Sequence, residues 1–491
     1  MAKPRNEDLQ MKIPALMHLS RLGYGYLTAS QLRLRHRKSN FLPETLRAAI
    51  GRINGISPAP EVFDRLMSDL EISLEERDLG QCFYHILRDG WNGISLIDFV
   101  HPENNIFQSA AELSCGSGAD SFRPDITLFV NGLPLAMIEL KTQNRPRGLQ
   151  AEYDRMLTRF RGKKGGRYLQ CVQVWAFSDD QMSDPSCLLP SGGAFFAALM
   201  TDDFPVYPVR EKYPGVFTRL LPRDPVEEKR ILADNGISER PHNRTFQRNL
   251  SPQKMTHRML TTLFDRRRFL FLLRYGIRYI RETDLAGQEV RIRRMLTTDQ
   301  LFALGDLVRK AERGWKNWTV PSCGAAGEKA MNASMTALLR DLFPEARLFW
   351  VSDDEAALTQ DREALESCGV VCAAPGEKMQ SKVILFSATG DLPTFPGESE
   401  DTGTIREKGD HSETSPNTAK NFAVRSVFIL PRLPLRYGEK PFLAAALRKA
   451  DADAILITRG TSHMPESVLS SALPVHGEGA LYYYAAVPDS L

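Results

Sequence analysis

Three ionisable side chains flank a pair of short apolar segments that are rich in strand-forming residues. Asp125 precedes the run ITLFV, and Glu139 and Lys141 end the run LPLAMIELK. Two carboxylates and a lysine on one face of a sheet suit metal-dependent hydrolysis of a phosphodiester. Asp125 and Glu139 would bind Mg²⁺, with the Leu140 carbonyl as a third ligand. Lys141 would orient or deprotonate the attacking water and offset charge in the transition state.

The same residues also fit a purely structural hairpin, with a surface aspartate and an ion pair at the end of a strand. Acidic residues are depleted in strands, and burying one is costly unless it is paired or bound to a metal. An acid followed at a distance by Glu139-Leu140-Lys141 is common by chance, so the surrounding residues must decide between the two interpretations.

The turn between the two predicted strands determines whether the three side chains meet. Asn131-Gly132 favours a hairpin turn. A two-residue loop would pair Asp125 with Ile138 and put Glu139 on the opposite face, since a shift of one residue reverses every side chain. A three-residue loop with the glycine left-handed pairs Asp125 with Glu139, and Lys141 then shares their face. We therefore expect the three-residue turn.

The stretch RPDITLFVNGLPLAMIELK, residues 123–141, closely resembles the nuclease signature of type I restriction enzyme R subunits, which belong to the PD-(D/E)xK nuclease superfamily. The likeness covers nearly every position, and Asp125 follows Pro124 as the first acidic motif does in that family. The resemblance implies that the two acids and the lysine are catalytic, with Mg²⁺ as cofactor and double-stranded DNA as substrate. It implies a mixed sheet flanked by helices for an endonuclease domain over residues 1–240.

Two segments before the hairpin carry further expectations. Residues 94–113 indicate strand, turn and strand, with the turn at Pro102–Asn105, and they too resemble the R subunits. Residues 44–88 have helical periodicity. Nucleases of this superfamily often use one more acid from such a helix, although a salt-bridged exposed face is the simpler role for any single candidate. The candidates are Glu75, Glu76 and Asp78.

A basic helix is expected after the hairpin, and it carries the predicted DNA contacts. The QxxxY motif of many R subunits is absent, since Met156 and Phe160 occupy the best-fitting positions. The chain instead resembles a subfamily with the pattern ExxRxxxRF, matched by Glu152, Arg155, Arg159 and Phe160. That likeness implies that Arg155 and Arg159 contact DNA phosphate. Their spacing of four puts both on one helix face, as it also would for ordinary surface arginines.

Residues 241–475 resemble the first motor lobe of the same R subunits, a RecA-like parallel α/β domain, with its ATP chemistry removed. Gln300 lies in the segment that carries an adenine-reading glutamine in the family. In the phosphate-loop motif G-x-x-x-x-G-K-[ST], Glu328 follows Gly327 where the lysine belongs, and an acid there repels a triphosphate. Lys329 fits only if the loop slides by one residue, which loses the preceding glycine.

The other ATP-site residues point the same way. Leu430 and Pro431 replace the metal-binding Asp-Glu pair of the family, and no second motor lobe is expected before Leu491. ATP should therefore not be hydrolysed. Packing is kept, since continuous apolar runs predict a buried parallel sheet. We expect a flexible insertion at 394–421 and a C-terminal tail at 476–491. An unrelated α/β domain is the alternative.

Composition sets the remaining limits. The chain has 491 residues, enough for two or three domains, and its net charge of +3 is too small to indicate nucleic-acid binding by itself. The seven cysteines are scattered and odd in number, which favours reduced thiols in a cytoplasm. The sequence contains no run of about 18 uninterrupted apolar residues, so we expect no membrane span.

These observations favour a cytoplasmic, Mg²⁺-dependent DNA endonuclease of the type I R-subunit kind, with an intact nuclease site and an inactive ATPase lobe. The resemblance places it in restriction and phage defence, with methylation and specificity subunits as candidate partners. The alternative is a non-catalytic DNA-binding or assembly remnant of such a complex. Cleavage of DNA that depends on Asp125 would distinguish the two.

Overall fold

The chain divides into two compact units, Met1–Thr298 and Asp299–Leu491, and each is described here by itself. The computed structural model describes residues 8–75, 78–116, 121–142, 148–161, 166–181, 194–197, 219–237, 244–283, 287–312, 317–321, 328–352, 354–373, 383–387, 426–430, 454–460 and 482–483.

The first unit is built on a six-stranded mixed sheet in the order β1-β2-β3-β4-β5-β6. Strands β1 and β2 are parallel, as are β4 and β5, and the other neighbours are antiparallel. The strands are β1 (Gly25–Leu27), β2 (Phe107–Ala111), β3 (Ile126–Val130), β4 (Leu133–Leu140), β5 (Val174–Ser178) and β6 (Ala194–Ala197).

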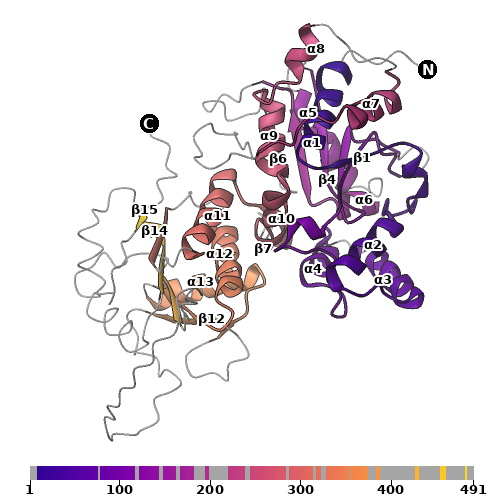
Figure 1. The fold of residues 1–491 in the computed structure, drawn as a ribbon. Coiled ribbons are helices and arrows are strands. Elements are labelled where there is room, and N and C mark those ends of the chain that lie inside the picture. The colour runs from indigo at the N-terminus through magenta and orange to yellow at the C-terminus, as the bar shows by residue number, and fades with distance from the viewer. Residues whose placement is uncertain are drawn as a thin grey trace, which may run out of the picture. The chain divides into compact units, whose positions relative to one another are not determined.

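Helices flank this sheet, so the predicted mixed sheet with flanking helices is confirmed (Figure 1). The first six are α1 (Ile13–Arg21), α2 (Pro43–Asn54), α3 (Pro60–Ser73), α4 (Gln81–Asp89), α5 (Gly148–Arg161) and α6 (Gly166–Cys171). The next four are α7 (Pro225–Asp234), α8 (Arg244–Asn249), α9 (Met255–Phe264) and α10 (Arg266–Tyr275). Helices α2 to α4 confirm the helical periodicity of residues 44–88.

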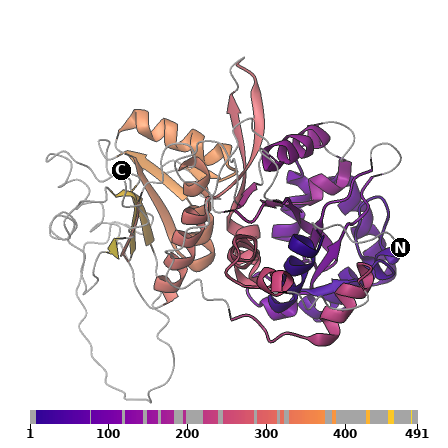
Figure 2. The same cartoon turned by 90° about the horizontal axis from the view of Figure 1, so that it is seen from above.

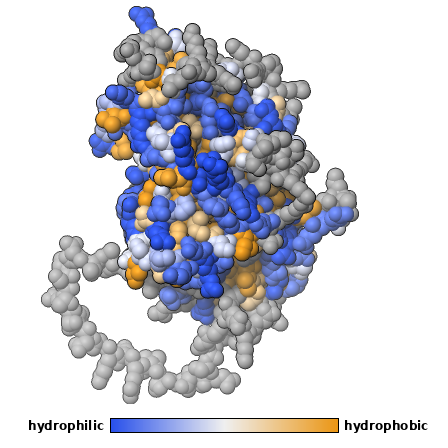
Figure 3. All heavy atoms as spheres, turned by 90° about the vertical axis from the view of Figure 1, so that its right-hand side faces the viewer, coloured by the Kyte–Doolittle hydropathy of each residue, from blue (hydrophilic) through white to orange (hydrophobic). Residues whose placement is uncertain are grey.

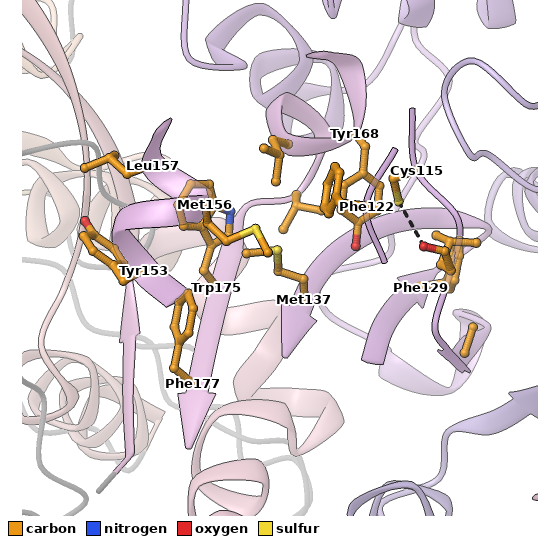
Figure 4. Packing of buried hydrophobic residues seen from close by; sticks show 14 of the residues in the cluster. Cys115, Phe122, Phe129, Met137, Tyr153, Met156, Leu157, Tyr168, Trp175 and Phe177 are labelled. Atoms are coloured by element: carbon orange, nitrogen blue, oxygen red, sulfur yellow. Dashed lines mark hydrogen bonds between the residues drawn. The ribbon is translucent and has the colours of Figure 1, made fainter. Parts of the chain in front are cut away.

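Helices α5 and α6 cover one face of the sheet and bury its largest side chains. Figure 4 shows Tyr153 and Met156 of α5 packed around Trp175, Phe177 and Met137 of the sheet. The Tyr153 ring lies edge-on to Trp175, with 6.3 Å between ring centroids, and to Phe177, at 6.0 Å. Aromatic packing of this kind fixes the helix against β4 and β5.

The strand predicted at the start of residues 94–113 is wrong, whereas the second strand, β2, is confirmed. Residues 95–101 form a loop that leads into a short 3-10 helix at Pro102–Asn104. Asp98 Oδ1 accepts hydrogen bonds from the backbone N–H groups of Val100 and His101, and the Asp98 N–H donates to Asn105 Oδ1. Side-chain bonds of this kind offer the backbone an alternative to a strand ladder.

Residues 255–275 pack with the first unit, although the sequence suggested a boundary near residue 240. The imidazoles of His18 in α1 and His257 in α9 are stacked, with 4.5 Å between centroids. Tyr24 Oη donates to the Phe264 carbonyl at 3.0 Å. The hydroxyl groups of Ser178, at the end of β5, and Thr256 lie 2.8 Å apart. Apolar periodicity alone could not reveal these contacts between distant segments.

A two-stranded antiparallel ribbon completes the first unit. It consists of β7 (Ile277–Thr283) and β8 (Glu289–Met295), and Figure 2 shows it as a long hairpin. Arg293 in the ribbon is buried, and its guanidinium lies over the Phe160 ring of α5 at 5.7 Å from the centroid. The base of the ribbon is therefore packed against the end of α5.

The second unit contains a seven-stranded sheet in the order β11-β12-β10-β13-β14-β9-β15, and all neighbouring pairs are parallel. The predicted parallel sheet is thus confirmed. Its strands are β9 (Asn317–Pro321), β10 (Arg347–Ser352), β11 (Cys372–Ala373), β12 (Val383–Ser387), β13 (Ser426–Leu430), β14 (Ala454–Gly460) and β15 (Tyr482–Tyr483). Its helices are α11 (Thr298–Glu312), α12 (Glu328–Leu342) and α13 (Glu355–Ser367).

Figure 3 shows one face of the molecule, on which hydrophilic residues predominate and hydrophobic ones form small scattered groups. Within the described ranges, every helix is too short or too polar to cross a membrane.

Candidate active site at the end of strand β4

A two-residue turn joins β3 to β4, so the predicted three-residue turn is wrong. Val130 pairs directly with Leu133, which leaves Asn131 and Gly132 as the loop. Their φ angles are 53° and 79°, the two positive values that a type I′ turn requires. The buried Asn131 side chain holds this turn, because its Oδ1 accepts from the Ile106 N–H at 2.7 Å.

A β-bulge in β4 changes the register beyond the turn. Phe129 pairs with Pro134, but Leu128 pairs with Ala136, so Leu135 is an extra residue in β4. Its carbonyl accepts a hydrogen bond from the N–H of the residue before β5, at 2.8 Å. A proline inside a strand is confined to edges and bulges, because it lacks an N–H for the ladder. Pro134 was therefore a sequence signal for this bulge that we missed.

The bulge brings the two acids opposite each other. Beyond it, Ile126 pairs with Ile138, and continuing that register by one residue places Asp125 opposite Glu139. The expectation that these acids share a sheet face thus agrees with the register, but the cause is a bulge and not a longer turn. The extra residue in the bulge shifts the pairing by one position, the same shift that a three-residue loop would have produced.

Asp125 is fixed at both its main chain and its side chain. Its carbonyl accepts from the Glu112 N–H at 3.1 Å, and its Oδ2 accepts from the Leu140 N–H at 2.7 Å. Glu139 is 3% exposed, and the carboxyl groups of Asp125 and Glu139 lie within hydrogen-bonding reach of each other. The structure therefore holds the two groups together at the end of β4.

Burial and the neighbouring acid both disfavour a charge on Glu139. Removal from water, followed by repulsion from Asp125, raises the pKa of Glu139 well above its usual range, against the attraction of Lys141. A buried carboxyl group with a second one next to it is stabilised by a proton or a cation between the two. Glu139 Oε1 is buried and accepts no hydrogen bond from the residues that the structure describes.

Lys141 lies beside these acids and contacts a third carboxylate, Glu152, which the sequence marked only as part of a pattern. Its Nζ is 3.7 Å from Glu139 Oε2 and 3.2 Å from Glu152 Oε2. Burial by itself would lower the pKa of Lys141, but the charges of Glu139, Asp125 and Glu152 raise it above the ordinary value. Glu139 shares a sheet face with Met137, which packs under α5, and Glu152 comes from that helix.

The donor set fits a magnesium ion. Mg²⁺ prefers oxygen ligands and keeps several waters, so two carboxylates such as Asp125 and Glu139 can suffice. Over the described part of the chain, no three His, Cys, Asp or Glu side chains are grouped so that they could hold a metal ion. Glu139 Oε1, which accepts no hydrogen bond from a described residue, is an oxygen that a cation could occupy.

The two predicted DNA-contacting arginines differ in their surroundings. The Arg155 side chain is 55% exposed, and its Nη1 is 3.2 Å from Glu152 Oε2. Arg159 is half-buried, with its guanidinium over the Phe122 ring at 5.1 Å from the centroid and its Nη1 3.7 Å from Met156 Sδ. Phosphate contact by either residue stays a prediction, and the exposed Arg155 is the better placed of the two.

The acids suggested on the preceding helix have structural contacts where the structure describes them. Asp78 is buried and accepts hydrogen bonds from the N–H groups of Gly80, Gln81 and Cys82, which lie at the start of α4. Glu75 forms an ion pair with Arg167. Glu76 lies outside the described residues.

The predicted ATP site is described only in part. Strand β9 ends at Pro321 and α12 begins at Glu328, whereas the loop with Gly327 lies outside the described residues. An acid in a first helical turn is favourable for the helix dipole, which gives Glu328 a structural reason to be there. Lys329 is exposed in α12. Leu430 ends the central strand β13, opposite Ile457, and Pro431 lies outside the described residues.

Fold and site together define a class: an α/β domain whose mixed sheet carries two acids and a lysine at the end of a buried strand. Residues 4–180 match the family described as type I restriction enzyme R protein N terminus. This part of the chain is therefore a type I restriction R protein N-terminal region.

Two curated relatives agree with that assignment. The chain is 33% identical over 100 residues to a putative type I restriction enzyme MjaVIIIP endonuclease subunit from Methanocaldococcus jannaschii, covering 20% of this chain and 9% of that protein. It is 35% identical over 121 residues to the type I restriction enzyme HindI endonuclease subunit from Haemophilus influenzae, covering 21% of this chain and 11% of that protein. The similarity thus spans about a tenth of each relative.

Proposed function

We propose that this protein is a Mg²⁺-dependent DNA endonuclease of the PD-(D/E)xK kind. The observation that supports this most strongly is the buried Glu139 with Asp125 next to it, with Glu139 Oε1 lacking a donor among the described residues and Lys141 beside it. The family assignment of residues 4–180 points to the same activity.

Asp125, Glu139 and the Leu140 carbonyl would hold Mg²⁺, which when bound supplies Lewis-acid polarisation of a phosphate and a more acidic water. The bond from the Leu140 N–H to Asp125 Oδ2 keeps the first carboxylate in place before substrate arrives. Lys141 donates from its ammonium to the attacking water or the phosphate. Its charge offsets the negative charge that develops as the phosphodiester bond breaks.

Double-stranded DNA is the proposed substrate. The exposed Arg155 would contact phosphate oxygens, with Arg159 one turn further along α5. Such contacts position DNA without reading its sequence. Sequence choice would then come from partner proteins, and methylation and specificity subunits of a type I restriction complex are the proposed partners.

For the second unit we propose a RecA-like lobe that does not hydrolyse ATP. The all-parallel sheet supports the fold, and the succession of β9, a loop and α12 is the context a phosphate loop requires. Glu328 at the start of α12 and Leu430 at the end of β13 replace groups that phosphate and metal binding need.

Nicking of supercoiled plasmid in Mg²⁺ tests the proposal. We expect cleavage by the wild type and none by Asp125→Ala. Asp64→Ala, an exposed aspartate on α3, is the matched control and should cleave normally. If the wild type binds DNA without cutting it, the non-catalytic DNA-binding or assembly role replaces this proposal.

A further inference from the structure

Glu152 is a buried carboxylate that contacts two cations through one oxygen atom. It is 2% exposed, and its Oε2 lies 3.2 Å from Lys141 Nζ and 3.2 Å from Arg155 Nη1. A charge so far removed from water is costly unless it is paired. The two cations therefore account for its burial, and they approach it from different elements, β4 and α5.

Glu152 cannot easily move away from Lys141. The next residue, Tyr153, is buried between Trp175 and Phe177, and Met156 packs one turn further along α5 (Figure 4). Displacing the carboxylate would require the helix to lose this packing. Glu152 is thus a fixed anchor.

Lys141 is, by contrast, only partly fixed. Its backbone N–H donates to the Ser178 carbonyl at 2.9 Å, which anchors its main chain beside β5. The side chain beyond that point is a flexible four-carbon stem, and its charge can reach either acid. The distances show its preference, since Nζ is nearer to Glu152 Oε2 than to Glu139 Oε2.

We propose that Glu152 is a positioning residue, which draws the Lys141 ammonium away from Glu139 and so keeps Glu139 available to a divalent cation. This inference rests on the proposed metal site. Without the Glu152 charge, the ammonium would pair with Glu139, compete with the metal and leave its place beside the reacting phosphate. The exposed Arg155 guanidinium, on the same helix, also pairs with the Glu152 carboxylate.

The test is a titration with Mn²⁺ by calorimetry on the full chain, because it does not depend on cleavage. We expect Glu152→Gln to weaken Mn²⁺ binding by about tenfold, a coupling typical of residues in contact. In a Lys141→Ala background the same substitution should change binding by less than about twofold, because the competing ammonium is gone. Glu152→Asp, which retains the charge, should bind Mn²⁺ more tightly than Glu152→Gln.

Cleavage kinetics of the same single and double variants provide a second test. Glu152→Gln should lower kcat with little change in KM, and the double variant should be no slower than Lys141→Ala alone. An equal loss of Mn²⁺ affinity in both backgrounds, or no loss in either, would overturn the inference while leaving the metal site standing. A wild type that binds no Mn²⁺ would instead overturn the proposed function, and this inference with it.

Discussion

The two units treat the ends of their buried strands in opposite ways. Strand β4 of the first unit is buried along its whole length, yet it ends in Glu139-Leu140-Lys141, with Asp125 opposite. Strand β13 of the second unit lies between β10 and β14 and ends in Leu430. A strand's apolar interior therefore says little about chemistry, because the residues that follow it decide whether the end of the sheet can bind a metal or a phosphate.

The charged end of β4 indicates a function because it makes folding less favourable. Burial, and then repulsion from the neighbouring Asp125, raises the pKa of Glu139, so placing this carboxyl group here opposes folding. A structural hairpin gains nothing from that repulsion. An apolar residue such as Leu430, which pairs with Ile457 of β14, carries no such cost. The strain in the first unit is what a functional site would explain.

The largest expected effect comes from removing a carboxylate at the end of β4, which makes this strand end more like the uncharged end of β13. Asp125→Asn or Glu139→Gln should abolish DNA cleavage and Mn²⁺ binding, because each removes one of the two charges that we propose bind the metal. Plasmid nicking and calorimetry measure both quantities. Cleavage that persists in Glu139→Gln would mean that the two strand ends do not differ in chemistry.

Lys141→Ala sharpens the same comparison with a smaller loss. Cleavage should slow by roughly 10²–10⁴-fold, the usual contribution of one positioned acid-base or charged group. Mn²⁺ binding should be largely retained, since the two carboxylates remain. Single-turnover rates at saturating metal measure this effect, and an unchanged rate would remove Lys141 from the mechanism.

The turn that builds the site can be tested through stability. Gly132→Ala should destabilise the protein by about 1–3 kcal/mol, because alanine is strained in a left-handed conformation. At Gly132 the φ angle is +79°, and an added Cβ would lie 2.6 Å from the Leu42 carbonyl oxygen. Gly236→Ala is the matched control, with a φ of +75° and nothing within 4 Å.

Denaturant midpoints of the two variants separate backbone strain from steric overlap. We expect Gly132→Ala to lose more stability than Gly236→Ala, because only the first also displaces α2. Equal losses would show that the turn fits less closely against its neighbours than the structure indicates.

The smallest expected effects concern DNA binding. Arg155→Ala should weaken binding equally on unrelated sequences and reduce the salt slope by about one for a lost phosphate contact. Arg159→Ala should also lower stability, because its guanidinium stacks on Phe122. Fluorescence anisotropy over a range of salt concentrations measures the slope, with the exposed Arg52 on α2 replaced by alanine as control. A sequence-selective loss would indicate base readout instead.

Much of the fold followed from local patterns. The Asn131-Gly132 dipeptide placed the hairpin, and apolar runs placed the parallel strands of the second unit. The register did not follow, because it depends on the bulge at Leu135, whose carbonyl is satisfied by the distant Gln173 N–H. Pro134 signalled that irregularity, but we assigned it no role.

The site was predicted to a similar extent. Asp125, Glu139 and Lys141 were named from their residue types and from a family resemblance, and the structure brings them together. Glu152 was noted only as part of a sequence pattern, because its contact with Lys141 joins two elements whose packing the sequence does not specify. Long-range contacts such as His18 with His257 were invisible for the same reason.

We propose a working nuclease site in the first unit and a second unit that does not hydrolyse ATP. The most direct measurement follows plasmid nicking and phosphate release together, in Mg²⁺, with and without ATP. We predict nicking that is indifferent to ATP and lost in Asp125→Ala, with no phosphate released above background. Cleavage that requires ATP, with hydrolysis that disappears in Lys329→Ala, would contradict the account.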